Sequence, residues 1–358
     1  MPDASLPLAA RQFERILLVK PSSLGDVLHG LPVLHFLRRR FPTSIIHWLV
    51  AKPLAPLIAD QPGIDQLVMF DRKTLGRAGR SWQATGELSA FIKSLRRARY
   101  DLVIDLQGLF RSAFFTWISG APVRIGFREA REGARWLYSH HIPVAEDSLH
   151  AVDRNCDVAR LFEPAAAPAR FDYRIEPESE RVALDLIKGI GLNQNAYIAL
   201  VPGARWETKM WPPTSFAQVA IKLVERLGLR SILLGGPDDH ERCQHIERES
   251  DGAAVSLAGR TSLAGLAALI RHASCVVCHD SGAMHMAVAM EKPLVCIVGP
   301  TNPDRTGPYR RRADVVQKSL DCSPCYLRKL SQCGFEHACM VDLEVDRVVE
   351  AAVERTGS

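Results

Sequence analysis

The chain lacks the patterns that mark several common classes of protein. It contains no run of 18 apolar residues, so we expect no transmembrane helix. The first 14 residues do not combine a basic segment with an apolar one, so we expect no signal peptide and a cytoplasmic location, with contact at a membrane surface left open. Spacings typical of helix-turn-helix, RNP or zinc-finger modules are also missing, which argues against a nucleic-acid partner.

Two nucleotide-binding motifs and two metal-binding patterns are missing as well. Neither G-x-x-x-x-G-K-[ST] nor G-x-G-x-x-G occurs, so the sequence supports neither a P-loop nor a dinucleotide-binding turn. There is no D-x-D and no metal-binding pair of histidines. If the chain acts on a nucleotide diphosphate, a divalent metal is therefore not required to explain how the diphosphate leaves.

The length and the charge distribution suggest two domains with different partners. A chain of 358 residues is too long for one ordinary core. Residues 1–175 carry 24 Lys and Arg against 17 Asp and Glu, a net charge of +7, whereas residues 176–358 carry 21 against 23, a net charge of −2. A basic amino-terminal half suits an anionic partner such as a phosphorylated glycolipid or an anionic membrane.

Short apolar runs that end in Gly-containing turns recur along the chain and predict parallel strands followed by helices. The predicted strands are residues 15–20, 44–50, 67–70, 101–106, 123–127, 197–201, 231–234, 254–257, 273–279 and 294–298. A stretch rich in Pro and Ala, residues 164–180, is the best candidate for a linker. We therefore expect an α/β fold with two parallel-sheet domains that face each other over a cleft. Their expected bounds are residues 1–168 and 178–340, followed by a helical segment, 341–358, that packs back toward the first domain.

The first domain offers a carboxylate and several arginines at expected strand-to-helix turns. Ser23 can cap a helix, Gly25 allows a close backbone approach, and Asp26 falls in the first helical turn. Asp26 either complements the helix dipole or acts as a general base at the mouth of a cleft. Candidates for gripping an anionic acceptor are Arg111, Arg128 and Arg131.

The second domain offers groups suited to a nucleotide diphosphate. Lys209 supplies a cation, and Asp239 follows a pair of glycines, where a carboxylate suits ribose hydroxyls or an adenine edge. The turn after residues 273–279 contains Asp280, Ser281, Gly282 and His285, and a helix N-terminus at such a turn attracts anions. Asp280 and Ser281 are also natural N-caps, so ordinary capping is the alternative interpretation.

Five motifs, in this order and spacing, resemble those of the ADP-heptose:lipopolysaccharide heptosyltransferases of glycosyltransferase family 9. They are S-S-L-G-D-V-L-H, V-I-D-L-Q-G-L, K-M-W-P, L-G-G-P-x-D and D-S-G-A-M-H-M-A. The resemblance runs from about Ile16 to Met340, and its middle part is more similar to heptosyltransferase I than to II. It implies a GT-B fold, which consists of two Rossmann-like domains, and an inverting, metal-independent transferase of lipopolysaccharide core biosynthesis.

The resemblance also implies roles for individual residues. Asp26 matches the general base and Lys209 the lysine on the donor diphosphate. Residues that would match the family's donor-binding positions for ADP-heptose are Lys209, Asp239, Asp280, Ser281, Gly282 and His285. From their positions at expected helix starts, we add Ser23, Gly25 and Thr261 to the expected donor-binding residues. Arg131 and Arg111 would match the basic surface that receives the anionic, Kdo-containing lipid A acceptor, and Arg128 joins them as an expected acceptor-binding residue from its place in the turn. Because the acceptor is a membrane lipid, the enzyme would dock on the inner face of the inner membrane without spanning it, and catalysis would need no cofactor.

Four of the nine cysteines cluster near the end of the chain: Cys322, Cys325, Cys333 and Cys339. They could bind a structural zinc ion or remain reduced thiols in a loop that packs over the cleft. This segment departs from the heptosyltransferase I pattern and leaves the transferred sugar open.

Three other functions remain open at this point. The chain could transfer a sugar from another nucleotide, or be a sugar-nucleotide epimerase with the same architecture, which would bind a UDP-sugar and need no lipid acceptor. It could also be a nucleotide-binding regulatory protein without catalytic activity, in which case Asp26 would be dispensable.

Overall fold

The chain divides into two compact units, Met1–Arg174 and Ile175–Ser358. The structure is a computed structural model that describes residues 6–77, 79–163 and 169–357. The division lies inside the predicted linker, residues 164–180. No helix within the described ranges combines the length and the apolar character that crossing a bilayer requires.

The first unit contains a six-stranded sheet with the order β3-β2-β1-β4-β5-β6, and every neighbouring pair is parallel. The strands are β1 (Arg15–Val19), β2 (Ile45–Ala51), β3 (Gln66–Phe70), β4 (Leu102–Asp105), β5 (Val123–Phe127) and β6 (His140–Ile142). The central strands β1 and β4 are almost completely buried because helices cover both faces of the sheet.

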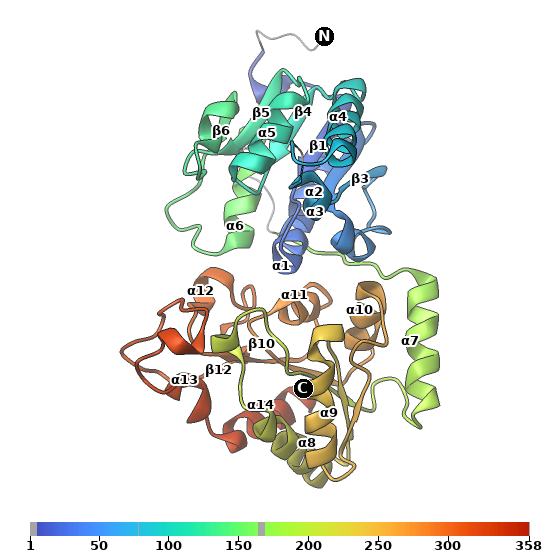
Figure 1. The fold of residues 1–358 in the computed structure, drawn as a ribbon, viewed down its shortest axis with the longest axis vertical. Helices are drawn as coiled ribbons and strands as arrows, with labels where there is room; N and C mark the ends of the chain where they lie inside the picture. The colour runs from blue at the N-terminus through green and yellow to red at the C-terminus, as the bar shows by residue number, and fades with distance from the viewer. Residues whose placement is uncertain (1–5, 78, 164–168, 358) are drawn as a thin grey trace. The chain divides into compact units, whose positions relative to one another are not determined.

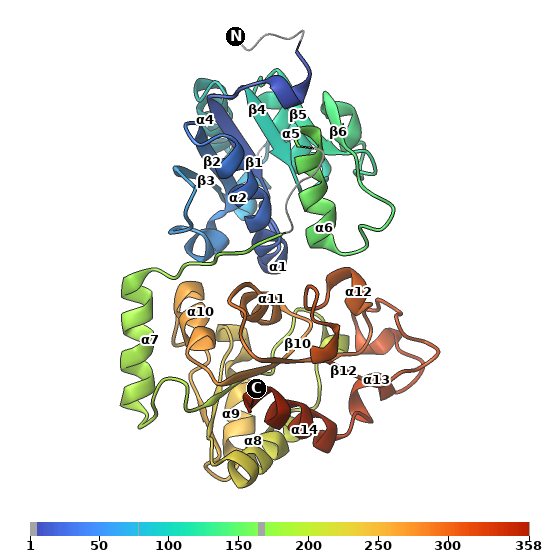
Figure 2. The same cartoon turned by 180° about the vertical axis from the view of Figure 1, so that it is seen from behind.

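Helices lie on both faces of this first sheet (Figures 1 and 2). Its helices are α1 (Leu24–Leu28), α2 (Leu31–Arg40), α3 (Arg72–Leu75), α4 (Trp82–Arg97), α5 (Phe110–Ile118) and α6 (Ala151–Cys156). One core cluster joins Leu17, Val19 and Val103 of the strands to Leu95 of α4 and Phe115 of α5, so these two helices cover the same face.

The second unit repeats this architecture with the order β12-β11-β10-β7-β8-β9, again parallel throughout. Its strands are β7 (Ile198–Val201), β8 (Ser231–Leu233), β9 (Ala254–Ser256), β10 (Cys275–His279), β11 (Leu294–Val298) and β12 (Val315–Gln317). Its helices are α7 (Pro177–Gly189), α8 (Pro213–Leu227), α9 (His240–Glu249), α10 (Leu263–Arg271), α11 (Gly282–Ala289), α12 (Pro303–Thr306), α13 (Ala338–Val341) and α14 (Val345–Thr356).

The C-terminal helix α14 belongs to the core of the second unit. It packs against α8 and against strands β10 and β11, and it buries Val348, Val349 and Ala352. Arg355 also pairs with the buried carboxylate of Asp314. The structure therefore places α14 in the second unit, and its packing back toward the first domain stays a prediction.

In each sheet, successive strands of the sequence are added outward in one direction and then, from the centre, in the opposite direction. We call the position between the two central strands, where this direction changes, the reversal point. In the first unit this point lies between β1 and β4, and in the second it lies between β7 and β10. In open α/β sheets, ligands bind outside the carboxyl ends of the strands at such a point. The loops after these four strands are therefore where a functional site is expected.

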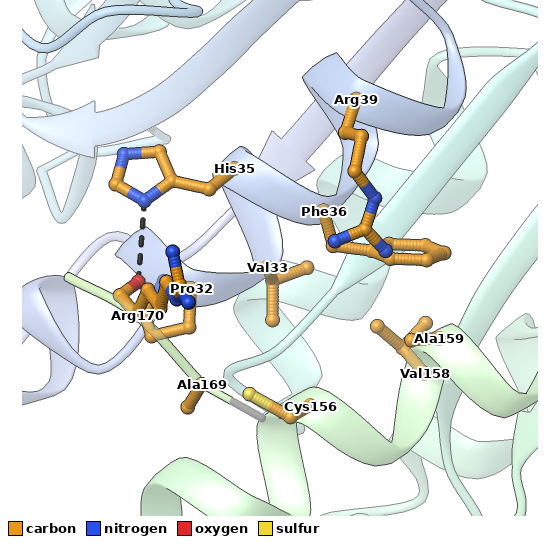
Figure 3. A pocket seen from close by; sticks show the side chains of 10 residues that line it. All are labelled: Pro32, Val33, His35, Phe36, Arg39, Cys156, Val158, Ala159, Ala169 and Arg170. Atoms are coloured by element: carbon orange, nitrogen blue, oxygen red, sulfur yellow. Dashed lines mark hydrogen bonds between the residues drawn. The ribbon is translucent and has the colours of Figure 1, made fainter. Parts of the chain in front are cut away.

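The segment that leaves the first unit is fixed to it by hydrogen bonds. Gln61 exchanges two hydrogen bonds with the backbone of Arg174, at 2.6 and 3.0 Å, and the Tyr173 hydroxyl donates to the Leu57 carbonyl. His35 Nδ1 lies 3.2 Å from the Arg170 carbonyl, beside a cavity of about 410 Å³ (Figure 3). The cavity is lined by α2, by residues 156–159 and by Ala169 and Arg170, and none of the predicted site residues lines it.

Candidate functional site

Asp26 lies in the loop after β1, in the first turn of α1, as the sequence predicts. Its Oδ2 accepts hydrogen bonds from the backbone N–H and from the hydroxyl of Ser23, each at 2.8 Å. The side chain is 39% exposed, so a substrate hydroxyl can reach it. These two hydrogen bonds from Ser23 hold the carboxylate in place at the carboxyl edge of the sheet.

Lys20, which the sequence analysis missed, forms an ion pair with this carboxylate. Its ammonium lies 3.8 Å from Asp26 Oδ1 and donates to the Leu106 carbonyl at 2.6 Å. Lys20 is almost completely buried. It therefore joins the loop after β1 to the loop after β4, on the two sides of the first reversal point.

The loop after β4 is shaped by a buried carboxylate. Asp105 is fully buried and accepts hydrogen bonds from Gln107 N, Gly108 N and the Tyr138 hydroxyl, at 2.8, 3.2 and 2.8 Å. Burial raises the pKa of Asp105, and these hydrogen bonds oppose that rise. Gly108 has φ +67°, in the left-handed region that favours glycine. This network fixes the loop that leads from β4 into α5.

The three predicted acceptor arginines lie on neighbouring loops at this edge. Arg111 is in the first turn of α5, while Arg128 and Arg131 follow β5, the strand next to β4. All three are exposed, and none forms an ion pair within the described part of the chain. The Arg131 backbone N–H donates to the Gly108 carbonyl at 3.0 Å, which joins the two loops. These side chains are available to an anionic ligand.

In the second unit, the loops that carry the predicted donor-binding residues follow adjacent strands. Along the sheet order β10-β7-β8-β9, they contain Asp280 to His285, then Lys209, then Asp239, then Thr261. Because all four strands are parallel, these loops meet at one edge. The structure therefore places every predicted donor-binding residue of this unit along the same side of the sheet.

Lys209 and Asp280 form a buried ion pair at the second reversal point. Lys209 Nζ donates to Asp280 Oδ2 at 2.7 Å and to the Asp280 carbonyl at 3.1 Å. Thr301, which sequence reasoning missed, donates to the same Oδ2 at 2.7 Å. The side chains of Lys209 and Asp280 are 15% and 5% exposed. The lysine lies 4.7 Å from the centre of the Trp206 ring, which further restrains its position.

Ser281 occupies the N-cap of α11, but its side chain does not cap the helix. The structure has no cap hydrogen bond from this residue, and its buried hydroxyl has no hydrogen-bond partner among the described residues. The first N–H groups of a helix have no partner within the helix. The amino end of α11, which starts at Gly282, therefore keeps the donors that an anion would use.

Asp239 is positioned by close contact with two glycines. A Cβ atom at Gly203 would lie 2.1 Å from Asp239 Oδ1, and one at Gly235 would lie 2.6 Å from Asp239 Cβ. Asp239 Oδ2 also accepts from the Gly236 backbone N–H at 2.9 Å. Gly203, two residues after β7, and Gly235, two residues after β8, thus make room for this carboxylate. Thr261 lies just before Ser262, which caps α10.

His279, the residue before Asp280, acts as a neutral structural group. It is fully buried, and its Nε2 accepts the backbone N–H of Trp211 at 2.9 Å. Burial, assisted by the positive charges of Arg242 and Lys209, lowers the pKa of His279 to about 3. The imidazole is therefore uncharged at neutral pH and can accept this hydrogen bond.

Because the pKa of His279 is lowered in the folded protein, we expect the protein to lose stability in acid. The unfolded chain gains a proton near pH 6.5, whereas the folded protein does so only near pH 3. The stabilisation is complete above pH 6.5 and is lost as the pH falls toward 3, by up to about 1.4 kcal/mol per pH unit. We expect urea unfolding between pH 6 and 4 to show a shallower decline for His279→Gln, which keeps an acceptor but does not titrate. Parallel declines for the two proteins would contradict this account.

All nine cysteines are free thiols. Cys322, Cys325 and Cys333 are partly exposed, and burial together with the three neighbouring thiols raises the pKa of Cys339 to about 11. Within the described ranges, no three His, Cys, Asp or Glu side chains are arranged to hold a metal ion. The cysteine-containing loop instead packs beside the ion pair: Thr208 donates to the Leu327 carbonyl at 2.5 Å.

Comparisons with known proteins agree with this arrangement. The model of glycosyltransferase family 9 (heptosyltransferase) matches residues 88–334. Lipopolysaccharide heptosyltransferase 1 of Pseudomonas aeruginosa is 34% identical over 321 residues, which cover 87% of this chain and 86% of the relative. Lipopolysaccharide heptosyltransferase 2 of Salmonella typhimurium is 28% identical over 346 residues, which cover 94% of this chain and 97% of that relative.

A solved structure supports both the fold and the family. Escherichia coli ADP-heptose lipopolysaccharide heptosyltransferase II superimposes with a TM-score of 0.76 at 25% identity, over 96% of this chain and 98% of the other. The predicted GT-B fold is therefore confirmed. With its two parallel sheets and an extended match to the family, this chain belongs to glycosyltransferase family 9, the heptosyltransferases, and is a glycosyltransferase.

Proposed function

We propose that this enzyme transfers a heptose from ADP-heptose to the Kdo-containing inner core of lipopolysaccharide, with inversion at the anomeric carbon. The observation that carries the proposal is the Lys209–Asp280 pair beside the amino end of α11, at the second reversal point. A cation next to a helix N-terminus suits a diphosphate. A relative that is 34% identical is named lipopolysaccharide heptosyltransferase 1, which supports this choice of donor and acceptor.

Asp26 is the proposed general base. It accepts the proton of the acceptor hydroxyl as that oxygen forms a bond to the anomeric carbon of the donor, and the bond from this carbon to the diphosphate oxygen breaks. The electron pair of the broken bond stays with the departing ADP. The hydrogen bonds from Ser23 keep one carboxylate oxygen fixed, and the exposed part of the side chain receives the proton.

Lys209 is the proposed stabiliser of the leaving diphosphate. An ammonium group has three N–H donors, and Asp280 takes two of them. The third, together with the free N–H groups at the start of α11, can meet the charge that develops on the diphosphate. This arrangement explains departure of ADP without a divalent metal.

The remaining predicted residues have supporting roles in this proposal. Asp239 and Thr261 would bind the nucleoside of the donor. Its phosphates and sugar would be bound by Ser281, Gly282 and His285. Ser23 and Gly25 would contact the donor beside Asp26. The exposed cations Arg111, Arg128 and Arg131 would bind the anionic acceptor. Because that acceptor is a lipid, we also propose that the enzyme works in the cytoplasm at the inner face of the inner membrane.

A direct assay tests the proposal. The purified protein, incubated with ADP-heptose and Kdo-lipid A, should add one heptose to the acceptor by mass spectrometry, at an unchanged rate in EDTA. In a thermal-shift screen, ADP should raise the melting temperature more than UDP, GDP or CDP, because a ligand that binds only the folded state stabilises it. Stabilisation by UDP instead of ADP, or loss of transfer in EDTA, would contradict the proposal.

A structural zinc ion at Cys322, Cys325, Cys333 and Cys339 stays a prediction. The opposing interpretation, reduced thiols in a packed loop, agrees with the contact between this loop and Thr208. Elemental analysis of the purified protein separates the two. One zinc per chain, lost in Cys322→Ser, would establish the metal site, whereas a metal-free protein with an unchanged melting temperature in EDTA would establish the thiols.

A further inference from the structure

The outward face of α5 is apolar although it is exposed. Phe110 and Trp117 are 54% and 49% exposed, and Phe114 and Ile118 lie beside them, half-buried. The ring centres of Phe110 and Phe114 are 6.3 Å apart, and those of Phe114 and Trp117 are 6.2 Å apart, so the aromatic side chains form one continuous row. An amphipathic surface helix of a globular protein normally turns charged residues to solvent.

Two neighbouring elements extend this face. The helix α4 packs against α5, and Arg96 near its end donates to the Ile118 carbonyl at 3.2 Å. The short 3-10 helix η3 (Ala134–Leu137) packs against the other side of α5. Trp82 at the start of α4 is 96% exposed, and Trp136 in η3 is 76% exposed. We use the name aromatic surface for the exposed side chains of Trp82, Phe110, Trp117 and Trp136, together with the half-buried Phe114 and Ile118 between them. Figure 1 shows α4 and α5 on the same face of the first sheet.

The part of the chain that carries the aromatic surface is basic. Residues 72–135, which include all three elements, carry 13 Lys and Arg against 5 Asp and Glu, a net charge of +8, although the whole chain carries +5. On α4, Lys93, Arg96 and Arg97 are exposed. The Arg135 guanidinium lies 4.4 Å from the centre of the Trp136 ring, so a cation and an aromatic ring are presented together.

We propose that the aromatic surface docks the enzyme on an anionic lipid bilayer. Tryptophan side chains favour the interface between headgroups and acyl chains, and the Lys and Arg side chains around them are attracted to anionic headgroups. The core of a protein–protein interface is depleted of charged residues, whereas here Lys and Arg surround the aromatic residues and outnumber Asp and Glu, although Glu132 accepts from the Phe110 backbone N–H. The complementary partner is therefore a surface with a net negative charge.

The position of the surface also fits a lipid acceptor, and in this respect the inference rests on the proposed function. Phe110 directly precedes Arg111, and η3 begins three residues after Arg131. The same two loops thus carry the proposed acceptor arginines and lead into the aromatic surface. Docking through α5 and η3 would hold those arginines at the level of the headgroups.

Vesicle co-sedimentation tests the proposal. The wild type should bind vesicles of phosphatidylethanolamine and phosphatidylglycerol, and bind pure phosphatidylcholine much less. The double variant Trp117→Ser/Trp136→Ser should bind at least about tenfold more weakly. The variant Lys93→Glu/Arg97→Glu should lose the preference for anionic vesicles. Phe335→Ser is the matched control, because it removes a 63% exposed aromatic side chain from the second unit and should leave binding unchanged.

An activity measurement separates this inference from the proposed function. The tryptophan double variant should lose activity on acceptor embedded in vesicles but retain it on the same inner-core oligosaccharide after removal of its acyl chains. A wild type that binds vesicles but transfers heptose to neither acceptor would overturn the proposed function alone. Vesicle binding that is unchanged in the double variant, or a dimer in light scattering that the double variant dissociates, would overturn the docking surface.

Discussion

Replacement of Asp26 by Asn should lower kcat by at least about a hundredfold, because the amide cannot accept a proton from the acceptor hydroxyl. Asn keeps the size of the side chain and an oxygen that can accept from the Ser23 backbone N–H, which donates to Asp26 at 2.8 Å. The affinity for ADP, measured by calorimetry, should stay within about twofold, since the diphosphate contacts are assigned to the second unit. Initial rates at saturating donor and acceptor give kcat directly.

Ser23→Ala is the matched control for this experiment. It removes the hydroxyl that donates to Asp26 Oδ2 but leaves the carboxylate able to take a proton. At saturating donor we expect only a small loss of kcat, whereas KM for the donor should rise, because Ser23 is also a proposed donor-binding residue. Loss of the hydrogen bond to Asp26 should lower the stability by about 1 kcal/mol. Asp26→Asn protein that folds normally and still turns over within tenfold of the wild type would exclude Asp26 as the base.

The sequence predicts most of the strands, but it does not predict their order in each sheet. Every predicted strand is present, because each is a compact apolar run that ends in a turn. The two that were missed, β6 (His140–Ile142) and β12 (Val315–Gln317), are three-residue edge strands without a continuous apolar run. Only the order of the strands shows that the loops carrying Asp26 and Lys209 each lie at a reversal point of a sheet.

For the site, the sequence predicts which loops matter but not which atoms meet. Lys209 and Asp280 were both expected to bind the donor, yet their ion pair joins residues 71 positions apart and depends on β7 and β10 being neighbours. Thr301 and Lys20 were missed because no motif distinguishes a threonine after a strand or a lysine at the end of one. For Ser281 the sequence predicts the position but not the contact. The residue lies at the N-cap of α11 as expected, but its hydroxyl does not cap the helix.

Replacement of Lys209 by Met should both unfold the protein more easily and abolish transfer. The Asp280 carboxylate, 5% exposed, would remain as a buried charge without its cation. Removal of one partner of such a pair costs about 3–5 kcal/mol. Transfer should fall by at least about a hundredfold, since the diphosphate loses its stabilising cation. Urea unfolding gives the stability, and kcat/KM for the donor gives the loss of transition-state stabilisation.

The double variant Lys209→Met/Asp280→Asn separates the two effects. Because it removes both charges, it should recover most of the lost stability, since paired charges replaced together leave no uncompensated ion. Activity should not recover, because the cation for the diphosphate is still missing. Lys222→Met is the control in the same unit: Lys222 pairs with Asp346, but the two side chains are 40% and 69% exposed, so the cost should be at most about 1 kcal/mol. Recovery of transfer in the double variant would show that Lys209 serves only to neutralise Asp280, and the leaving diphosphate would then be stabilised by the amino end of α11 alone.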